Sequence, residues 1–258
     1  DTPADEWFDR MLTTARREFA ANADWLTFCR SAADIRAAVE TGKAAALLSI
    51  EGAELLPDRP DALDYVYDAG VRLITLTWNY RSRYGCSSAV DQNEGLTELG
   101  KQLVRDCGEK GILVDVSHLS DRGFQDVCEA TDRPFVATHS DSRVLCRNSR
   151  NLTDEQFAEI ANRRGLVGVN LYTPFLVRQS DSVIDDAIDH IERFLGMYGE
   201  KVVALGCDFD GCDTLPIGID GLADMYRLAD RMLTLGYKQE TVDGLFYDNA
   251  FNFMQKML

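Results

Sequence analysis

Four side chains that can bind metal ions or transfer protons each follow a short apolar run directly: Glu51, His118, His139 and Asp208. Two of the three histidines of the chain are among them. Imidazole and carboxylate groups are ligands that suit zinc and related divalent ions. A glutamate such as Glu51 can bridge two ions, and an aspartate such as Asp208 can move the proton of a metal-activated water. The pattern predicts metal-dependent hydrolysis.

The apolar runs are expected to be buried strands, and they cover residues 44–50, 71–77, 112–117, 134–138, 166–171 and 202–207. Runs that are apolar throughout are typical of strands covered on both faces, as in a parallel sheet. In a (β/α)8 barrel, the side chains at the carboxyl ends of different strands meet at one mouth. Such a fold would gather the four candidates around shared ions.

Amphipathic helices with start and stop signals are predicted between the strands. The predicted starts are Ser31 with Asp34, Thr153 with Gln156, and Ser182 with Asp185, and another helix over 96–107 is predicted to stop at Gly111. Alternating strands and helices favour an α/β fold, with a TIM-like (β/α)8 barrel over 1–258 as the first choice and an open doubly wound sheet as the second. No glycine-rich phosphate loop follows a strand, which argues against a nucleotide-binding fold.

Arg150 is a candidate for binding a substrate carboxylate, because a guanidinium can hold a carboxylate through two parallel hydrogen bonds. It lies just before a predicted helix start. Arg143 and Arg147 lie close by and remain alternatives from the residues alone.

Two further residues compete with the main candidates. Asp210 in CDFDG lies beyond the strand end, so it is expected to organise the turn, and Asp208 is preferred as the proton carrier. His190 lies inside a predicted helix beside Asp189 and Glu192, and it is expected to be structural or exposed.

Charge and cysteine content narrow the class of protein. The net charge of −16 argues against partners such as nucleic acid or an anionic membrane, and there is no apolar run long enough to span a bilayer. The seven cysteines are scattered without metal-binding spacing, which favours free thiols and a cytoplasmic location. Most are expected to be small buried apolar groups, although Cys207 adjoins Asp208.

A series of motifs resembles the renal (membrane) dipeptidase family in its bacterial form, from about Ser31 to DNAFNF near the carboxyl terminus. The motifs are LLSIEGAELL, ITLTWN, GLTELGKQLVRDC, ILVDVSHLS, PFVATHSDSR, RNLTDEQ, VGVNLY and ALGCDFDG. The resemblance implies a barrel with two zinc ions that hydrolyses dipeptides through a metal-bound hydroxide. Some members of that family also open β-lactam rings or accept a D-residue on the carboxyl-terminal side.

The resemblance also implies roles for individual residues. Glu51 matches the bridging carboxylate, and His118 and His139 match ligands of the second metal. Asp208 matches the catalytic acid and base, Arg150 the arginine that holds the terminal carboxylate, and Tyr172 a tyrosine of the substrate pocket.

This sequence departs from the family pattern in two places. No histidine, and therefore no HxD motif, precedes His118, whereas the opening strand of the family carries an HxD motif whose His and Asp bind the first metal. We therefore expect an amino-terminally incomplete barrel that lacks one or both zinc ions and has an open edge, which a homodimer would cover. Trp78 stands where many relatives have a substrate-binding histidine, which predicts a shift in specificity.

Dipeptide hydrolysis is the leading hypothesis, and two alternatives remain. One is a different barrel amidohydrolase, acting on a cyclic amide, a lactone or a base that can be deaminated. The other is an inactive fragment or pseudoenzyme that serves as a binding partner. A carboxylate-binding arginine separates the first alternative from the dipeptidase, and metal content separates the second.

Overall fold

The computed structural model describes residues 4–258 and divides into two compact units. The first unit contains the chain up to Arg133 together with Met254–Leu258, and the second contains Pro134–Phe253. No helix within the described residues is long and apolar enough to cross a membrane.

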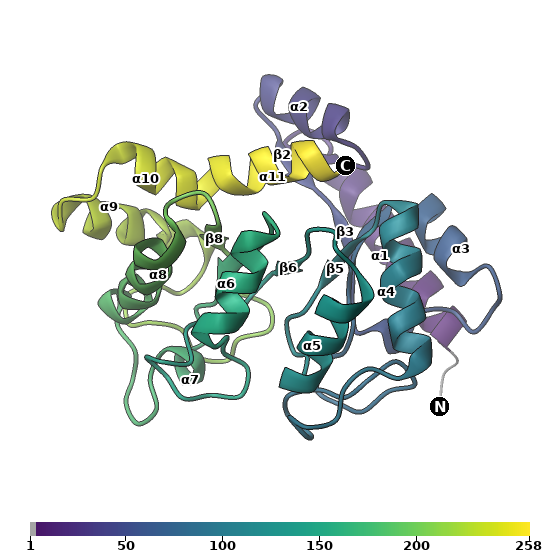
Figure 1. The fold of residues 1–258 in the computed structure, drawn as a ribbon. Helices are drawn as coiled ribbons and strands as arrows, with labels where there is room; N and C mark the ends of the chain where they lie inside the picture. The colour runs from purple at the N-terminus through teal and green to yellow at the C-terminus, as the bar shows by residue number, and fades with distance from the viewer. Residues whose placement is uncertain (1–3) are drawn as a thin grey trace. The chain divides into compact units, whose positions relative to one another are not determined.

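The first unit alternates helices and parallel strands (Figure 1). Strands β3 (Leu48–Glu51), β4 (Val71–Thr75) and β5 (Leu113–Asp115) pair in that order, and all run parallel. The connecting segments carry the 3-10 turn η1 (Ala53–Leu55), α3 (Ala62–Ala69) and α4 (Glu98–Lys110), and α5 (Asp121–Ala130) follows β5. This order confirms the predicted α/β class within the unit.

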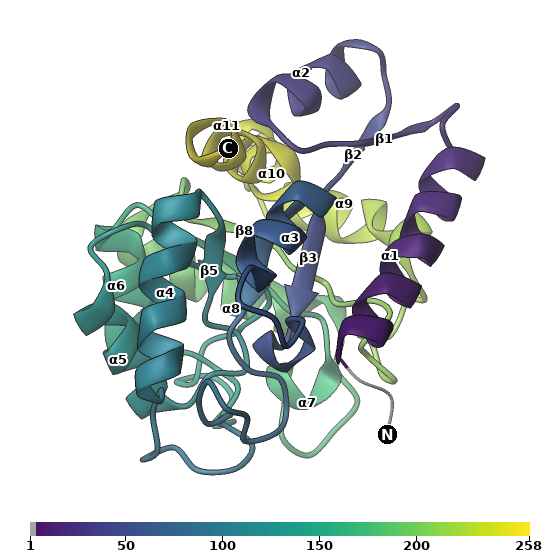
Figure 2. The ribbon, with the colours of Figure 1, turned by 90° about the vertical axis from the view of Figure 1, so that its right-hand side faces the viewer.

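The predicted strand over 44–50 is wrong as a single element. Its first half, β2 (Ala44–Ala46), pairs with β1 (Leu26–Phe28), whereas its second half belongs to the β3–β4–β5 set. In Figure 2, α1 (Ala4–Ala21), in purple, precedes β1, and α2 (Ala32–Glu40) connects β1 to β2. The alanines of β2 are exposed or half-buried, so the apolar run there does not mark core.

The second unit repeats the alternation. Its parallel strands are β6 (Val136–Ala137), β7 (Leu166–Val169) and β8 (Val203–Leu205), paired in that order. Its helical elements are α6 (Asp154–Asn162), α7 (Thr173–Leu176), α8 (Ile184–Tyr198), η2 (Leu222–Asp224), α9 (Tyr226–Thr234), α10 (Gln239–Asp243), η3 (Gly244–Asp248) and the start of α11 (Asn249–Met257). The stacked rings of Phe157 and Phe194, 4.2 Å apart and fully buried, join α6 to α8.

Close backbone approach explains two glycines of the second unit. A Cβ atom at Gly168 would lie 2.0 Å from the carbonyl oxygen of Thr138, and one at Gly206 would lie 1.8 Å from the same atom. Only glycine fits where backbones approach this closely. The carboxyl ends of β6, β7 and β8 therefore lie tightly together, just before His139, Asn170 and Asp208.

Most predicted helix starts are confirmed, and one is wrong. Thr153 and Gln156 form both hydrogen bonds of a capping box at α6. The hydroxyl of Ser31 accepts from the Asp34 amide at α2, and α4 ends at Gly111 in the left-handed conformation. Ser182 is not a cap, because its hydroxyl pairs with that of Thr173, 2.7 Å away, and α8 begins at Ile184.

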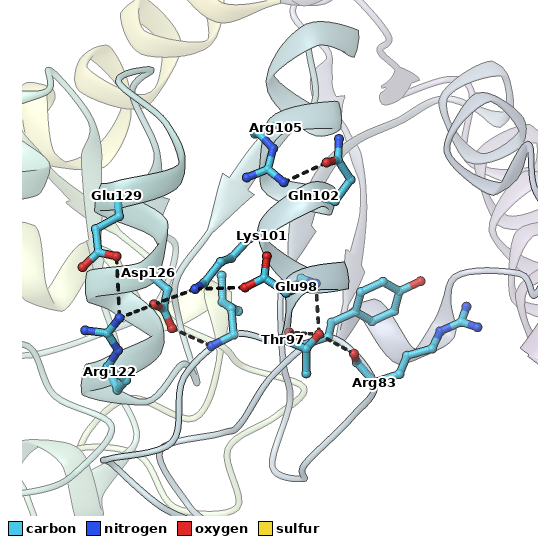
Figure 3. Close-up of polar contacts among 12 residues, drawn as sticks. Arg83, Thr97, Glu98, Lys101, Gln102, Arg105, Arg122, Asp126 and Glu129 are labelled. Carbon is cyan, nitrogen blue, oxygen red and sulfur yellow. Dashed lines mark hydrogen bonds and ion pairs between the residues drawn. The ribbon is translucent and has the colours of Figure 1, made fainter.

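A buried carboxylate anchors the long segment between β4 and α4. Asp126 of α5 is 2% exposed and accepts from the backbone amide of Leu96 at 2.8 Å. Arg122 and Lys101 lie against its other oxygen at 2.7 and 3.5 Å, as Figure 3 shows. These charges compensate the burial of the carboxylate and fix the end of the segment where Thr97 caps α4.

Candidate active site

Glu51 and His118 meet in the first unit. The Nε2 atom of His118 lies 3.0 Å from Oε1 of Glu51. The His118 side chain is buried, whereas the Glu51 side chain is 45% exposed. Glu51 ends β3, and Gly52 turns the chain immediately afterwards with a φ of 99°, which favours glycine.

The backbone of His118 has a left-handed conformation, with a φ of 67°. Such values are uncommon outside glycine and persist where the surroundings hold them. The carbonyl oxygen of His118 accepts from the Ser87 hydroxyl at 3.1 Å and from the Ser88 amide at 2.8 Å. Upstream, buried Asp115 accepts from the Thr75 hydroxyl and the Ser117 amide, which shapes the turn after β5.

The geometry of the Glu51–His118 contact suits a cation. Nδ1 of His118 lies 3.0 Å from Oδ1 of Asn79, and an amide oxygen only accepts, so Nδ1 carries the proton when the ring is neutral. Nε2 then directs a lone pair at the Glu51 carboxylate. Two facing lone pairs need a proton or a cation between them. Bonds to zinc of about 2.0–2.2 Å from each atom are compatible with the 3.0 Å separation.

His139 lies in the second unit, two residues after the end of β6. It is 8% exposed, and its Nδ1 atom lies 2.8 Å from the hydroxyl of Thr138. Nη2 of Arg150 lies 3.5 Å from the carbonyl oxygen of His139. The second unit thus brings the predicted ligand His139 and the predicted carboxylate-binding Arg150 together.

Arg150 is favoured over its two rivals by burial and by its contacts. Its side chain is 8% exposed, and its guanidinium lies 5.3 Å from the ring centre of Phe175. Arg143 instead donates to the carbonyl oxygens of Asn151 and Ser149, and therefore stabilises the loop over residues 143–151. Arg147 is exposed.

Tyr172 shares the Phe175 contact with Arg150. The two aromatic rings meet edge to face with centres 4.9 Å apart. Both predicted substrate-binding side chains of the second unit therefore lie against one ring, which the sequence interpretation did not single out. Phe175 belongs to the short helix α7, directly after the VNLY motif.

Asp208 also has a left-handed backbone, with a φ of 57°. Its Oδ2 atom accepts from the side-chain amide of Asn170 at 3.3 Å, and its side chain is only partly buried. Asp210 is exposed. These placements favour Asp208 as the residue that can reach a substrate while remaining oriented.

Asn170 connects several of these groups and was missed by the sequence interpretation. It is fully buried, and its side-chain oxygen accepts from the Tyr172 amide at 2.7 Å. Its backbone amide donates to Oδ1 of buried Asp141 at 3.0 Å. Burial raises the pKa of Asp141 well above its usual range, although the Asn170 hydrogen bond and the charge of Arg150 oppose that rise.

The two thiols near Asp208, those of Cys207 and Cys212, are poorly suited to act as nucleophiles. Burial raises the pKa of both Cys207 and Cys212 to about 12, which leaves them protonated at neutral pH. Cys29, Cys86, Cys107 and Cys146 are buried, as expected of small apolar groups, and the other three cysteines are half-buried.

His190 is structural. It is 1% exposed, its Nδ1 atom accepts from the Ser142 amide at 2.9 Å, and its Nε2 atom lies 3.1 Å from the carbonyl oxygen of Leu176. A neutral ring that donates through Nε2 satisfies both contacts. Burial is the main reason that the pKa of His190 lies below its ordinary value of 6.5.

Acidification is expected to destabilise the protein partly through His190. Below pH 6.5, the unfolded chain binds a proton at this ring that the folded chain excludes, so this contribution to stability is lost as the pH falls. In His190→Asn, the slope of the free energy of unfolding against pH should be smaller, by at most about 1.4 kcal/mol per pH unit. Urea unfolding between pH 5 and 7.5 measures it, and parallel slopes would contradict the assignment.

A family model for membrane dipeptidases, described as peptidase family M19, matches residues 7–257. The chain belongs to the membrane dipeptidase family. A protein in the pqqA 5′ region of Klebsiella pneumoniae is 35% identical over 250 residues, which cover 93% of this chain and 92% of that protein.

Solved structures agree with the M19 assignment. A metallopeptidase of Rhodobacter sphaeroides, bound to a phosphinate mimic of the dipeptide L-Ala-D-Ala, is 31% identical with a TM-score of 0.88, over 95% of this chain and 72% of that one. The M19 dipeptidase AC is 32% identical with a TM-score of 0.86, over 93% and 73%. An amidohydrolase of Pseudomonas aeruginosa is 25% identical with a TM-score of 0.87, over 95% and 83%. These likenesses confirm the predicted (β/α)8-type fold class of metal-dependent hydrolases.

Proposed function

We propose that this chain is a zinc-dependent dipeptidase that hydrolyses the peptide bond of dipeptides. Membership in the M19 family supports peptidase chemistry, and the Rhodobacter sphaeroides relative binds a dipeptide mimic. The observation that carries the choice of a dipeptide is the burial of Arg150 beside His139. A buried guanidinium at this place suits a substrate that presents a free carboxylate.

Glu51, His118 and His139 would hold the metal. Each offers one ligand atom, and the set of one carboxylate and two imidazoles could bind a divalent ion. The contact between Glu51 and His118 and the burial of His139 at the end of β6 support this assignment. A metal ion bound there would polarise the scissile carbonyl and lower the pKa of water.

Arg150, Tyr172 and Asp208 would act on the substrate directly. Arg150 binds the terminal carboxylate, and Tyr172 lies alongside it against Phe175. Asp208 takes a proton from the attacking water and passes it to the leaving amine, oriented for that role by Asn170. Trp78, which is 39% exposed and lies edge to face with Tyr80, would contact the substrate side chain and set specificity.

The role of Arg150 is tested by comparing substrates with and without a carboxylate. In Arg150→Met, we expect kcat/KM for a dipeptide to fall by about 10–100-fold, because hydrogen bonds to charged groups contribute about 1.5–3 kcal/mol. Hydrolysis of the same dipeptide with an amidated carboxyl terminus should already be slow and should change little. Release of amino acids in the presence of zinc measures both rates.

The matched control is Arg147→Met, which removes an exposed guanidinium from the same loop. It should leave kcat/KM unchanged. If Arg150→Met keeps its thermal stability and also keeps the preference for free dipeptides, the proposed carboxylate site is wrong.

Hydrolysis of another amide is a second candidate function, favoured by the likeness to the Pseudomonas aeruginosa amidohydrolase. Such a substrate would not need the Arg150 guanidinium. Wild-type activity toward amidated dipeptides as high as toward free ones, and unchanged in Arg150→Met, would favour this alternative.

A further inference from the structure

We propose that Asn79 is a positioning residue that holds the proton of His118 on Nδ1 and so keeps Nε2 available to a metal ion. The inference rests on the proposed metal site and adds the residue that prepares it. Its starting point is the 3.0 Å contact between Oδ1 of Asn79 and Nδ1 of His118. Asn79 lies 39 residues before His118, in the segment that leaves β4.

The chemistry of the contact selects one tautomer. An amide oxygen accepts hydrogen bonds and cannot donate them, so a proton on Nδ1 is stabilised and a lone pair there is repelled. With the proton on Nδ1, the lone pair of Nε2 faces Oε1 of Glu51 at 3.0 Å. The other neutral tautomer would place its hydrogen where the metal must bind.

The segment that carries Asn79 also binds the backbone of His118. Ser87 and Ser88 donate to the carbonyl oxygen of His118 at 3.1 and 2.8 Å. Next to it, the amide of Ser120 donates to the carbonyl oxygen of Cys86 at 3.2 Å. Residues 79–88 therefore form hydrogen bonds with both the ring and the backbone of His118, and that backbone is in the left-handed conformation.

The same segment is fixed to its surroundings. Arg81 and Glu94 form an ion pair across it, and the Cys86 amide donates to the carbonyl oxygen of Gly95 at 3.2 Å. Its far end is bound to buried Asp126, which accepts a hydrogen bond from the Leu96 amide at 2.8 Å. An anchored segment can hold Asn79 in place before any metal binds, and partners of this kind typically change metal affinity by 10–100-fold.

Two readouts test the inference on the intact chain. The first is the imidazole nitrogen spectrum of protein labelled with ¹⁵N-histidine, which is simple because the chain has three histidines. His118 should show a protonated Nδ1, in contrast to His190, whose contacts favour a proton on Nε2. The second is the affinity of the metal-free protein for zinc ion, measured by calorimetry.

Asn79→Ala is expected to lose the protected Nδ1 proton of His118 and to bind zinc about 10–100-fold more weakly. Asn79→Asp keeps an acceptor oxygen at the same place and should restore the proton and most of the affinity. Asn93→Ala removes an exposed asparagine of the same segment and should change neither readout.

The inference is overturned if His118 in the wild-type chain carries its neutral-state proton on Nε2, or if a folded Asn79→Ala binds zinc as tightly as the wild type. A failure of the proposed metal site looks different. In that case the wild-type chain itself does not bind zinc, while the nitrogen spectrum of the metal-free protein still tests the role of Asn79.

Discussion

Replacing Asp208 by asparagine should lower kcat for a dipeptide by about 10²–10⁴-fold, the range that general acid–base catalysis contributes. The substitution removes the carboxylate that would carry the proton and keeps the shape of the side chain. Asparagine also tolerates the left-handed backbone found at this position, where φ is 57°. The fold and the zinc content should therefore stay unchanged. Steady-state hydrolysis measures the fall in kcat, and a parallel metal analysis measures the zinc content.

Asp210→Asn is the matched control, since it makes the same chemical change at an exposed residue two positions later. We expect it to retain nearly full activity. Equal losses in the two variants would show that the turn, rather than the carboxylate of Asp208, matters. Undiminished turnover in Asp208→Asn would remove this residue from the proposed chemistry.

Replacing His118 by asparagine should abolish measurable dipeptide hydrolysis and weaken zinc binding by more than about 100-fold, the upper end for loss of a residue that only supports a ligand. The variant removes an imidazole that would contact the metal directly. Asparagine accepts the left-handed backbone of this position too, where φ is 67°. The effect can therefore be assigned to the missing ligand atom, and zinc titration with an activity assay measures it.

His190→Asn provides the control, because it removes a buried imidazole that accepts from one backbone amide and lies against a backbone carbonyl oxygen. It should lower stability and keep the zinc affinity of the folded protein. If His118→Asn binds zinc as well as the wild type, the metal lies elsewhere. A wild-type chain that binds no zinc would instead favour the pseudoenzyme hypothesis.

The sequence predicts the elements of the fold that depend on short-range patterns. Apolar runs locate β4, β5, β6, β7 and β8, and the Thr153–Gln156 pair locates the start of α6. The break between β2 and β3 was not predictable from hydrophobicity, because it depends on which neighbouring strand each half meets. Ser182 was misread for a similar reason, since its hydroxyl pairs with distant Thr173.

In the candidate site too, the sequence predicted what depends on local position and missed what depends on contacts between distant residues. Strand-end position pointed to Glu51 and His118, and the structure brings these two into contact. Asn79 and Asn170 were missed, since an asparagine acts here through partners 39 and 38 residues away. A polar residue inside an otherwise apolar run, as in VGVNLY, was the available signal for Asn170.

The backbone at His118 and Asp208 also restricts which mutations this protein can accept. With φ at 67° and 57°, both positions disfavour most side chains before any chemistry is considered, and β-branched residues most of all. Folding alone leaves a short set of tolerated residues, chiefly glycine, asparagine, aspartate and histidine. Few substitutions at these two positions can therefore remove activity without also destabilising the fold. A homologue that has lost activity should often carry asparagine or glycine there.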